Sequence, residues 1–385
     1  TVLADASYTV QARVIDTAGN RSPLVTQTVT VDTSLPSAGI IPVFGSITLD
    51  LGISASDFIT LDRTLLFNGT LTAPLSGDET LQFSLDGGAT WSATTVSGTN
   101  WTYDNTGVSL ANNTYLAQLR VIDSAGNIGQ SAQQTVVIYS AVPVGTASVT
   151  GITLDSGTSA TDFSTSDQTL VFSLTLAGVL GSNEFVQISL DAGSTWHDAT
   201  LSSGSTYVYD HTANILADGV YTLQARVFDV AGNSSAVATQ ILQIDTSAPS
   251  TGNAVAITTY TDLVPLQTGN FGSGTVTNDP APKLNGTVSG LNANDSVQVY
   301  EGTTLLGLAT VTGGTWTYQL AATADGSHTY HVVIADAAGN QGTASSDFSV
   351  TVDTQGPSAS TTLSITSINA DTGIGSDFIT SDNTL

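Results

Sequence analysis

The chain of 385 residues carries 32 acidic side chains against six basic ones, for a formal net charge of −26, and it has no cysteine. The charge argues against nucleic acid as a partner, because almost nothing can neutralise phosphates. The absence of cysteine excludes disulfides and thiolate metal sites. No apolar run reaches the roughly 18 residues of a membrane span. Since the sequence starts without Met or a secretion signal, we expect an internal segment of a longer secreted protein.

A strand-like segment that ends in an Asp-x-Ala-Gly-Asn turn recurs along the chain. Its first copy, residues 8–20, alternates apolar and polar side chains, which predicts a half-buried strand. Further copies lie at 115–127, 221–233 and 328–340, so the repeat is about 106 residues long, the size of an immunoglobulin domain. The tyrosine that opens each segment stands where a tyrosine corner is found, and His328 takes its place in the last copy.

Each copy is followed by another strand-like run and a linker that ends in a proline, which stops strand pairing. Three linkers have the form Asp-Thr-x-x-Pro, and the one that starts at Tyr139 reads Tyr-Ser-Ala-Val-Pro. So short a linker leaves little freedom between neighbours. The sequence therefore predicts an all-β protein of tandem immunoglobulin-like β-sandwich repeats, arranged as an extended, monomeric rod. The predicted units are 1–32, the last strands of a preceding repeat; 33–139, 140–245 and 246–353, three repeats of which the last is a divergent subtype; and 354–385, the first part of a following repeat.

Nearly all the negative charge is aspartate, which favours turns and oxygen-ligand cation sites. The aspartates fall into three recurring classes. The turn class comprises Asp16, Asp123 with Asn127, Asp229 with Asn233, and Asp336 with Asn340, and the linker class comprises Asp32, Asp245 and Asp353. The third class is a cluster after the first strand: Asp50, Asp57 and Asp62; Asp155, Asp162 and Asp167; and Asp371, Asp377 and Asp382. The divergent repeat offers Asp262 and Asp279 instead, and Tyr139 replaces the aspartate of one linker.

These classes are predicted to meet at the linkers. In an immunoglobulin sandwich the loop after the first strand faces the next domain, whereas the turn before the last strand faces the previous one. The linker at Tyr139 would then gather Asp57 and Asp62 with Asp229 and Asn233, and the linker at Asp245 would gather Asp162 and Asp167 with Asp336 and Asn340. Carboxylates this close repel each other unless a cation lies among them, and Ca²⁺ binds oxygen ligands in flexible geometry. We therefore predict calcium at each linker, with a weaker, absent or rearranged site and a softer joint at Tyr139. The alternative is that these residues only shape turns.

The motifs resemble a known family. The repeat length, the Asp-x-Ala-Gly-Asn turn and the Asp-Thr-x-x-Pro linker resemble the bacterial immunoglobulin-like repeats of giant RTX-type adhesins exported by type I secretion. The Asp-Phe-x-Thr-x-Asp cluster is similar to that of non-fimbrial adhesins, while Gly-Gly-Thr-Trp316 resembles a subtype of biofilm and ice adhesins. The resemblance implies a secreted, calcium-stiffened rod on the bacterial cell surface that serves attachment and virulence. In one relative it also implies contact between the repeats and host glycans.

Other motifs leave two further functions open. The segments around Asp86 and Asp191 match the Asp-box of sialidases, a hairpin turn that carries no chemistry itself. Trp91 and Trp196, which follow these turns, would stack on sugar rings if exposed, although a tryptophan in a sandwich is more often core. No Ser/His/Asp set or glycosidase-like carboxylate pair recurs, so we expect no enzyme. A structural spacer is the leading hypothesis. Glycan-binding modules and accessory modules of a secreted glycosidase are the alternatives.

Overall fold

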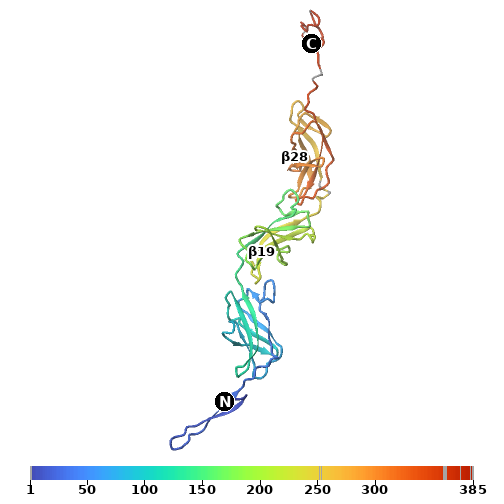
Figure 1. Cartoon of the computed structure of the whole chain (residues 1–385). Helices are drawn as coiled ribbons and strands as arrows, with labels where there is room; N and C mark the ends of the chain where they lie inside the picture. The colour runs from blue at the N-terminus through green and yellow to red at the C-terminus, as the bar shows by residue number, and fades with distance from the viewer. Residues whose placement is uncertain are drawn as a thin grey trace. The chain divides into compact units, whose positions relative to one another are not determined.

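The computed structural model describes residues 2–250, 252, 254–358, 362–372, 374–381 and 383. All regular structure in these residues is β, which confirms the predicted fold class (Figure 1). The chain divides into two compact units. One comprises residues 1–153, 169–216 and 220–242, and the other comprises 154–168, 217–219 and 243–385.

An antiparallel hairpin opens the first unit. Strands β1 (Ala6–Ala12) and β2 (Val25–Val31) pair with each other in a two-stranded sheet. The Tyr8 hydroxyl donates a hydrogen bond to the carbonyl oxygen of Ala4, 2.9 Å away, which is the bond of a tyrosine corner. The hairpin therefore has the form expected for the last two strands of a sandwich.

The first sandwich consists of two sheets with a shared core. One sheet has the order β3-β5-β9-β8, formed by Pro42–Ile47, Leu66–Leu71, Asn100–Asp104 and Thr95–Ser97. The other has the order β4-β11-β10-β6-β7, formed by Ile59–Thr60, Ile128–Ile138, Asn113–Ile122, Thr80–Ser84 and Ser92–Ala93. Phe67, Phe83, Trp101 and Leu119 fill the core, because the period-two pattern turns one face of each strand inward.

The second sandwich repeats this topology. One sheet has the order β12-β14-β18-β17, formed by Thr146–Ile152, Val171–Ala177, Thr206–Asp210 and Thr200–Ser203. The other has the order β13-β20-β19-β15-β16, formed by Ser164–Thr165, Ala238–Ile244, Gly219–Asp229, Glu184–Ser189 and His197–Asp198. Phe172 and Leu174 from the first sheet, and Val186 and Leu223 from the second, are almost completely buried. Strand β19 is labelled in Figure 1.

The third sandwich lies in the second unit and adds one short edge strand. One sheet has the order β22-β21-β24-β28-β27, formed by Gly269–Phe271, Ala254–Asp262, Lys283–Ser289, Thr315–Gln319 and Thr310–Thr312. The other has the order β23-β30-β29-β25-β26, formed by Thr275–Thr277, Phe348–Val352, Gly326–Ala335, Ser296–Glu301 and Thr304–Leu308. Tyr260, Trp316 and Tyr330 are the largest side chains in its core. The sequence difference of this repeat therefore leaves its fold unchanged.

In each sandwich a short strand next to the aspartate cluster pairs in parallel with the last strand. The pairs are β4 with β11, β13 with β20, and β23 with β30. This pairing continues to the linker, where the Tyr139 N–H donates to the carbonyl oxygen of Thr60 and the Asp245 N–H donates to that of Thr165. The linker residue is thus held directly beside the cluster loop of its own repeat.

Candidate functional site around the linkers

The turn carboxylates organise their own turns. Asp229 Oδ1 accepts hydrogen bonds from the N–H groups of Ala231 and Asn233 at 2.9 and 2.8 Å, and Oδ2 accepts one from Asn233 Nδ2 at 2.8 Å. Equivalent bonds to the turn asparagine are made by Asp16, Asp123 and Asp336. The hydrogen bond from the Asn127 side chain is the largest cause that lowers the pKa of Asp123. This part of the site matches the alternative that these residues shape turns.

The turn asparagine also reaches the preceding linker. Asn233 Nδ2 donates to the carbonyl oxygen of Tyr139 at 2.7 Å, and Asn340 Nδ2 donates to that of Asp245 at 2.8 Å. Asn127 makes the same contact with Asp32 at 3.1 Å. Because the linker residue contributes only its main-chain carbonyl, Tyr139 takes part as fully as an aspartate does. We call this contact the asparagine clamp.

The side chains of the linker aspartates bond locally. Asp32, Asp245 and Asp353 each accept a hydrogen bond at Oδ1 from the N–H two residues later, on Ser34, Ser247 and Gln355. Such a bond stabilises a tight Asx turn at the start of the linker. Tyr139 has no side-chain oxygen in a position to form it, which is the difference between this linker and the others.

A fourth class of residues, which the sequence analysis missed, also holds the linkers. Asp325 Oδ1 accepts hydrogen bonds from both the N–H and the hydroxyl of Thr354, at 2.9 and 2.8 Å. Asp5, Asn112 and Asp218 hold Thr33, Ser140 and Thr246 in the same way. A signal was present, because each of these residues stands three positions before the corner tyrosine or histidine.

The first aspartate of the cluster has one oxygen without a partner. Asp50 is only 7 % exposed, and its Oδ2 accepts the Phe58 N–H at 3.1 Å, whereas its buried Oδ1 has no hydrogen-bond partner. Asp155 and Asp371 also have a buried Oδ1 without a partner. Burial is the largest cause that raises the pKa of Asp50; the hydrogen bond from Phe58 opposes it, and the nearby charge of Asp57 adds to it. Most buried polar atoms in native proteins have a hydrogen-bond partner, so a buried carboxylate oxygen without one is an exception.

The remaining cluster aspartates are bonded within their loops. Asp57, Asp162 and Asp377 each accept the N–H two residues later. Asp62 accepts from Thr64 and Thr48, and the Asp167 N–H donates to the Thr165 hydroxyl. Asp382 lies outside the described residues. In the third sandwich Asp262 accepts from Val264 and Thr277, and Asp279 accepts from Leu263 and Ala281, so both carboxylates have partners at both oxygens.

The cluster loop of one sandwich donates a hydrogen bond to the main chain of the turn in the next. The Leu61 N–H donates to the carbonyl oxygen of Ala231 at 3.2 Å, and the Ser156 hydroxyl donates to that of Ala338 at 2.5 Å. Loop and turn are therefore in contact at both linkers, through residues other than the predicted aspartates. In the described part of the chain, however, no three or more His, Cys, Asp or Glu side chains gather in a group that could hold a metal ion. Any cation there would depend on main-chain carbonyls and water as well as on the carboxylates.

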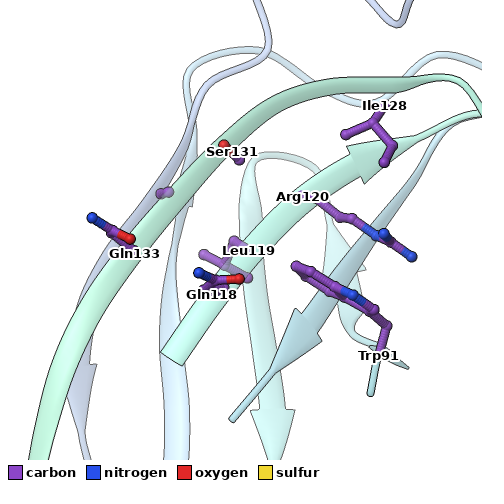
Figure 2. A pocket seen from close by; sticks show the side chains of 8 residues that line it. Trp91, Gln118, Leu119, Arg120, Ile128, Ser131 and Gln133 are labelled. Atoms are coloured by element: carbon purple, nitrogen blue, oxygen red, sulfur yellow. The ribbon is translucent and has the colours of Figure 1, made fainter. Parts of the chain in front are cut away.

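A second candidate lies on the first sandwich, in a groove of about 520 Å³ beside β10 and β11. Figure 2 shows Trp91 and Arg120 at one side of it, with Gln118 and Gln133 further along. The Arg120 guanidinium lies 4.1 Å from the centre of the Trp91 ring and donates two hydrogen bonds to Gln82. One face of the indole is thus covered, and a sugar ring would have to displace the guanidinium to stack there.

The second sandwich repeats this arrangement of arginine on tryptophan. Arg226 lies 3.9 Å from the centre of the Trp196 ring and 4.2 Å from that of Phe228, so it contacts two aromatic rings. Each tryptophan also donates its indole N–H to a carbonyl oxygen of the Asp-box turn, that of Gly88 or Gly193. These contacts are those of a structural brace for the hairpin.

Comparison with known proteins identifies the domain family of the repeats. The bacterial Ig-like domain pattern matches residues 46–139, 145–246 and 256–354, and a second bacterial Ig-like pattern matches residues 2–33. The chain is 29 % identical over 265 residues to Exoglucanase B of Cellulomonas fimi, with 66 % of this chain and 22 % of that protein covered. The chain thus spans about a fifth of that relative's length.

Two solved structures of adhesion proteins are also similar to this chain. One, from a study of host cell surface retention of a 1.5-MDa bacterial ice-binding adhesin, has 18 % identity, covers 84 % of this chain and 100 % of its own, and has a TM-score of 0.28. The other, a tetra-tandem repeat in the extending region of a large adhesion protein, has 18 % identity, covers 92 % and 83 %, and has a TM-score of 0.23. Among the described residues, no helix is long and apolar enough to cross a membrane.

Proposed function

Because this chain belongs to the bacterial Ig-like domain family, we propose that it is a non-catalytic spacer in the stalk of a secreted bacterial surface adhesin. In this proposal the repeats form a rod whose joints are stiffened by calcium, and the rod presents a binding region elsewhere in the protein. The observation that carries the proposal is the asparagine clamp, which recurs at Asp32, Tyr139 and Asp245 with the same pair of atoms. A spacer that holds a binding region at a fixed distance needs the same joint between each pair of repeats.

Calcium fits the cluster loops of the first two sandwiches. Asp50 and Asp57, and likewise Asp155 and Asp162, place two carboxylates near one another and leave one buried oxygen without a partner. Ca²⁺ is the cation suited to such a site, since it accepts carboxylate, carbonyl and water oxygens in flexible geometry, whereas Zn²⁺ prefers nitrogen or sulfur. When bound, the ion supplies positive charge that offsets the carboxylate repulsion. The third sandwich lacks the unpartnered oxygen, so we expect no equivalent site at Asp262 and Asp279.

Small-angle X-ray scattering with and without a chelator tests this function. We expect the chain to have a larger maximum dimension and a narrower distribution of shapes in calcium than in chelator. Isothermal titration should find calcium binding that Asp50→Asn and Asp155→Asn together weaken about tenfold or more, with Asp262→Asn as the matched control that leaves it unchanged. Scattering curves that superimpose with and without calcium would remove the stiffening role.

The similarity to Exoglucanase B supports a second candidate, a non-catalytic accessory segment of a secreted glycosidase. The two candidates differ in what the rest of the protein does. Hydrolysis of β-glucans by the full-length secreted protein, with no attachment of bacteria to surfaces, would favour the accessory role. Attachment that is lost on deletion of these repeats, without any hydrolase activity, would favour the adhesin spacer.

A further inference from the structure

The cluster loop of one sandwich and the turn of the next approach each other more closely than side chains allow. A Cβ atom added at Gly52 would lie 2.0 Å from the carbonyl oxygen of Val230, and one added at Gly157 would lie 2.1 Å from that of Ala337. Both glycines have positive φ angles, of 134° and 102°. Only glycine, which has no Cβ, can come this close to another main chain and readily adopt a positive φ. The two main chains are therefore in direct contact at both linkers. We call residues 50–62 and 155–167 the socket loops.

The turns contribute a glycine of their own to this contact. A Cβ atom added at Gly339 would lie 2.7 Å from the Gly157 nitrogen, and one added at Gly232 would lie 3.3 Å from the Gly52 nitrogen. The contact at the second linker is therefore tighter than that at the first. Glycine faces glycine in both, so the fit depends on the absence of side chains on the two partners.

The loop around Asp371, which has a similar sequence to the socket loops, makes the same internal hydrogen bonds, although the described residues place no turn against it. In the segment after the third sandwich, the Ser381 N–H donates to the Thr372 hydroxyl at 2.8 Å, and the Thr380 hydroxyl donates to the Ala370 carbonyl oxygen. In the second sandwich the corresponding bonds run from the Ser166 N–H to the Ser156 hydroxyl at 2.9 Å and from Thr165 to Leu154. The loop conformation is thus set by its own sequence, and docking needs little reordering.

We propose that each socket loop is a docking surface for the Asp-x-Ala-Gly-Asn turn of the following repeat, and that this contact closes the joint before calcium stiffens it. The inference rests on the proposed spacer function: the facing glycines and the asparagine clamp bring the two repeats together, and calcium adds stiffness to the closed joint. The partner is any immunoglobulin-like repeat whose turn carries glycine at its fourth position. A repeat with a larger residue there could not follow this socket.

The chain contains its own matched series for a test. Gly126, Gly232 and Gly339 occupy the same turn position with φ angles of 97°, 100° and 88°, so replacement by alanine imposes a similar local strain in each. Only their surroundings differ: a Cβ atom at Gly126 would meet nothing within 4 Å, whereas one at Gly232 or Gly339 would meet a socket loop. The series therefore separates strain in the turn from loss of docking.

The experiment measures the distribution of distances between two spin labels across each joint in the full chain, by pulsed electron paramagnetic resonance. The sequence has no cysteine, so spin labels can be attached at introduced cysteines. Labels at exposed Thr95 and Ser202 report on the joint at Tyr139, and labels at exposed Ser202 and Thr303 report on the joint at Asp245. Each pair is recorded in calcium and in chelator. We expect the distributions of the unsubstituted chain to be narrow in calcium and moderately broader in chelator. In both conditions we expect strong further broadening with Gly339→Ala, less with Gly232→Ala, and none with Gly126→Ala.

Each outcome bears on one of the two proposals. Distributions for Gly339→Ala that match those of the unsubstituted chain in chelator would overturn glycine docking. Broadening by Gly339→Ala in chelator as well as in calcium would support docking. Distributions of the unsubstituted chain that are equally narrow in calcium and in chelator would remove the calcium stiffening and leave docking intact.

Discussion

The imidazole of His328 lies between two hydrogen-bond acceptors: its Nδ1 is 2.6 Å from Glu301 Oε1, and its Nε2 is 2.9 Å from the carbonyl oxygen of Ala324. A neutral imidazole carries one N–H, so only the protonated ring donates to both. The first sandwich closes the same corner with Tyr115, whose hydroxyl donates to the Ala111 carbonyl oxygen at 3.1 Å. The third sandwich thus has an imidazole where the first has a phenol.

The third sandwich should lose stability as the pH rises. Burial lowers the pKa of His328, but the hydrogen bonds to Glu301 and Ala324 and the charge of Glu301 outweigh it and raise this pKa. A raised folded-state pKa means that the stabilisation is complete below the unfolded value of about 6.5 and is lost as pH rises through the folded value. The groups that contact the ring are Glu301 on β25 and Tyr330 on β29.

Hydrogen exchange of the β29 amides across this pH range measures the effect, after correction for the intrinsic exchange rate. We expect a loss on the order of 1 kcal/mol, which Glu301→Gln reduces. His328→Tyr restores the corner found at Tyr115 and should make the opening free energy independent of pH. A slope that persists in His328→Tyr would contradict this account.

Asp50→Asn should weaken calcium binding and strengthen the calcium-free protein. Loss of a direct ligand should lower the affinity about tenfold or more, while removal of a buried charge should raise stability in chelator by about 1 kcal/mol. Because folding raises the pKa of Asp50, the folded state binds the proton more tightly than the unfolded chain, and calcium-free stability rises as pH falls through that pKa. Calorimetric titration and thermal unfolding in chelator measure the two effects. Higher calcium-free stability without weaker calcium binding would show that Asp50 is not a ligand.

The joint at Tyr139 should bind calcium more weakly than the joint at Asp245. Its linker has no carboxylate, and a cation there loses one nearby negative charge. Calcium titration of Tyr139→Asp should reveal additional or tighter binding at that joint. Asp245→Tyr should remove calcium binding at the joint at Asp245. Equal calcium occupancy of the two joints in the unsubstituted chain would contradict this prediction.

Tyr115→Phe should destabilise the first sandwich by about 1 kcal/mol. The substitution removes the hydroxyl that bonds to Ala111 but keeps the ring, which packs against the core. Tyr8→Phe removes the same bond in the hairpin β1–β2 and is the matched control, because it should leave the unfolding of the first sandwich unchanged. Chemical denaturation followed by hydrogen exchange in β10 distinguishes the two. An effect of Tyr8→Phe on β10 would indicate coupling through the linker.

The repeated features of this fold could be predicted from sequence, because they depend on local patterns. Alternation of apolar residues specifies the strands, and the corner is predictable since Tyr8 and Tyr115 bond within four residues of their own position. Even the meeting of cluster loop and turn follows from the topology of a sandwich. These inferences need only the order of strands and their directions.

The roles of individual aspartates could not be predicted, because an aspartate in a turn looks the same whether it binds its own backbone or a metal ion. Asp229 is fully occupied by Asn233 and Ala231, whereas Asp50 leaves one oxygen unpartnered, and both occur in loops rich in glycine and serine. The contacts of Gly52 and Gly157 were also missed, since each lies against a residue about 180 positions away. Such contacts depend on three-dimensional packing and leave no local pattern.

The parallel pairing of the short strand with the last strand determines how a sandwich responds to force. A pull on the two ends of the first sandwich acts along β4 and β11, so the bonds that Phe58 and Thr60 accept from Val137 and Tyr139 are loaded in shear and must break together. A hairpin pulled open from its end would instead lose its bonds one at a time. The third sandwich pairs three residues of β23 with β30, against two in β4, and should therefore be the last to rupture under tension.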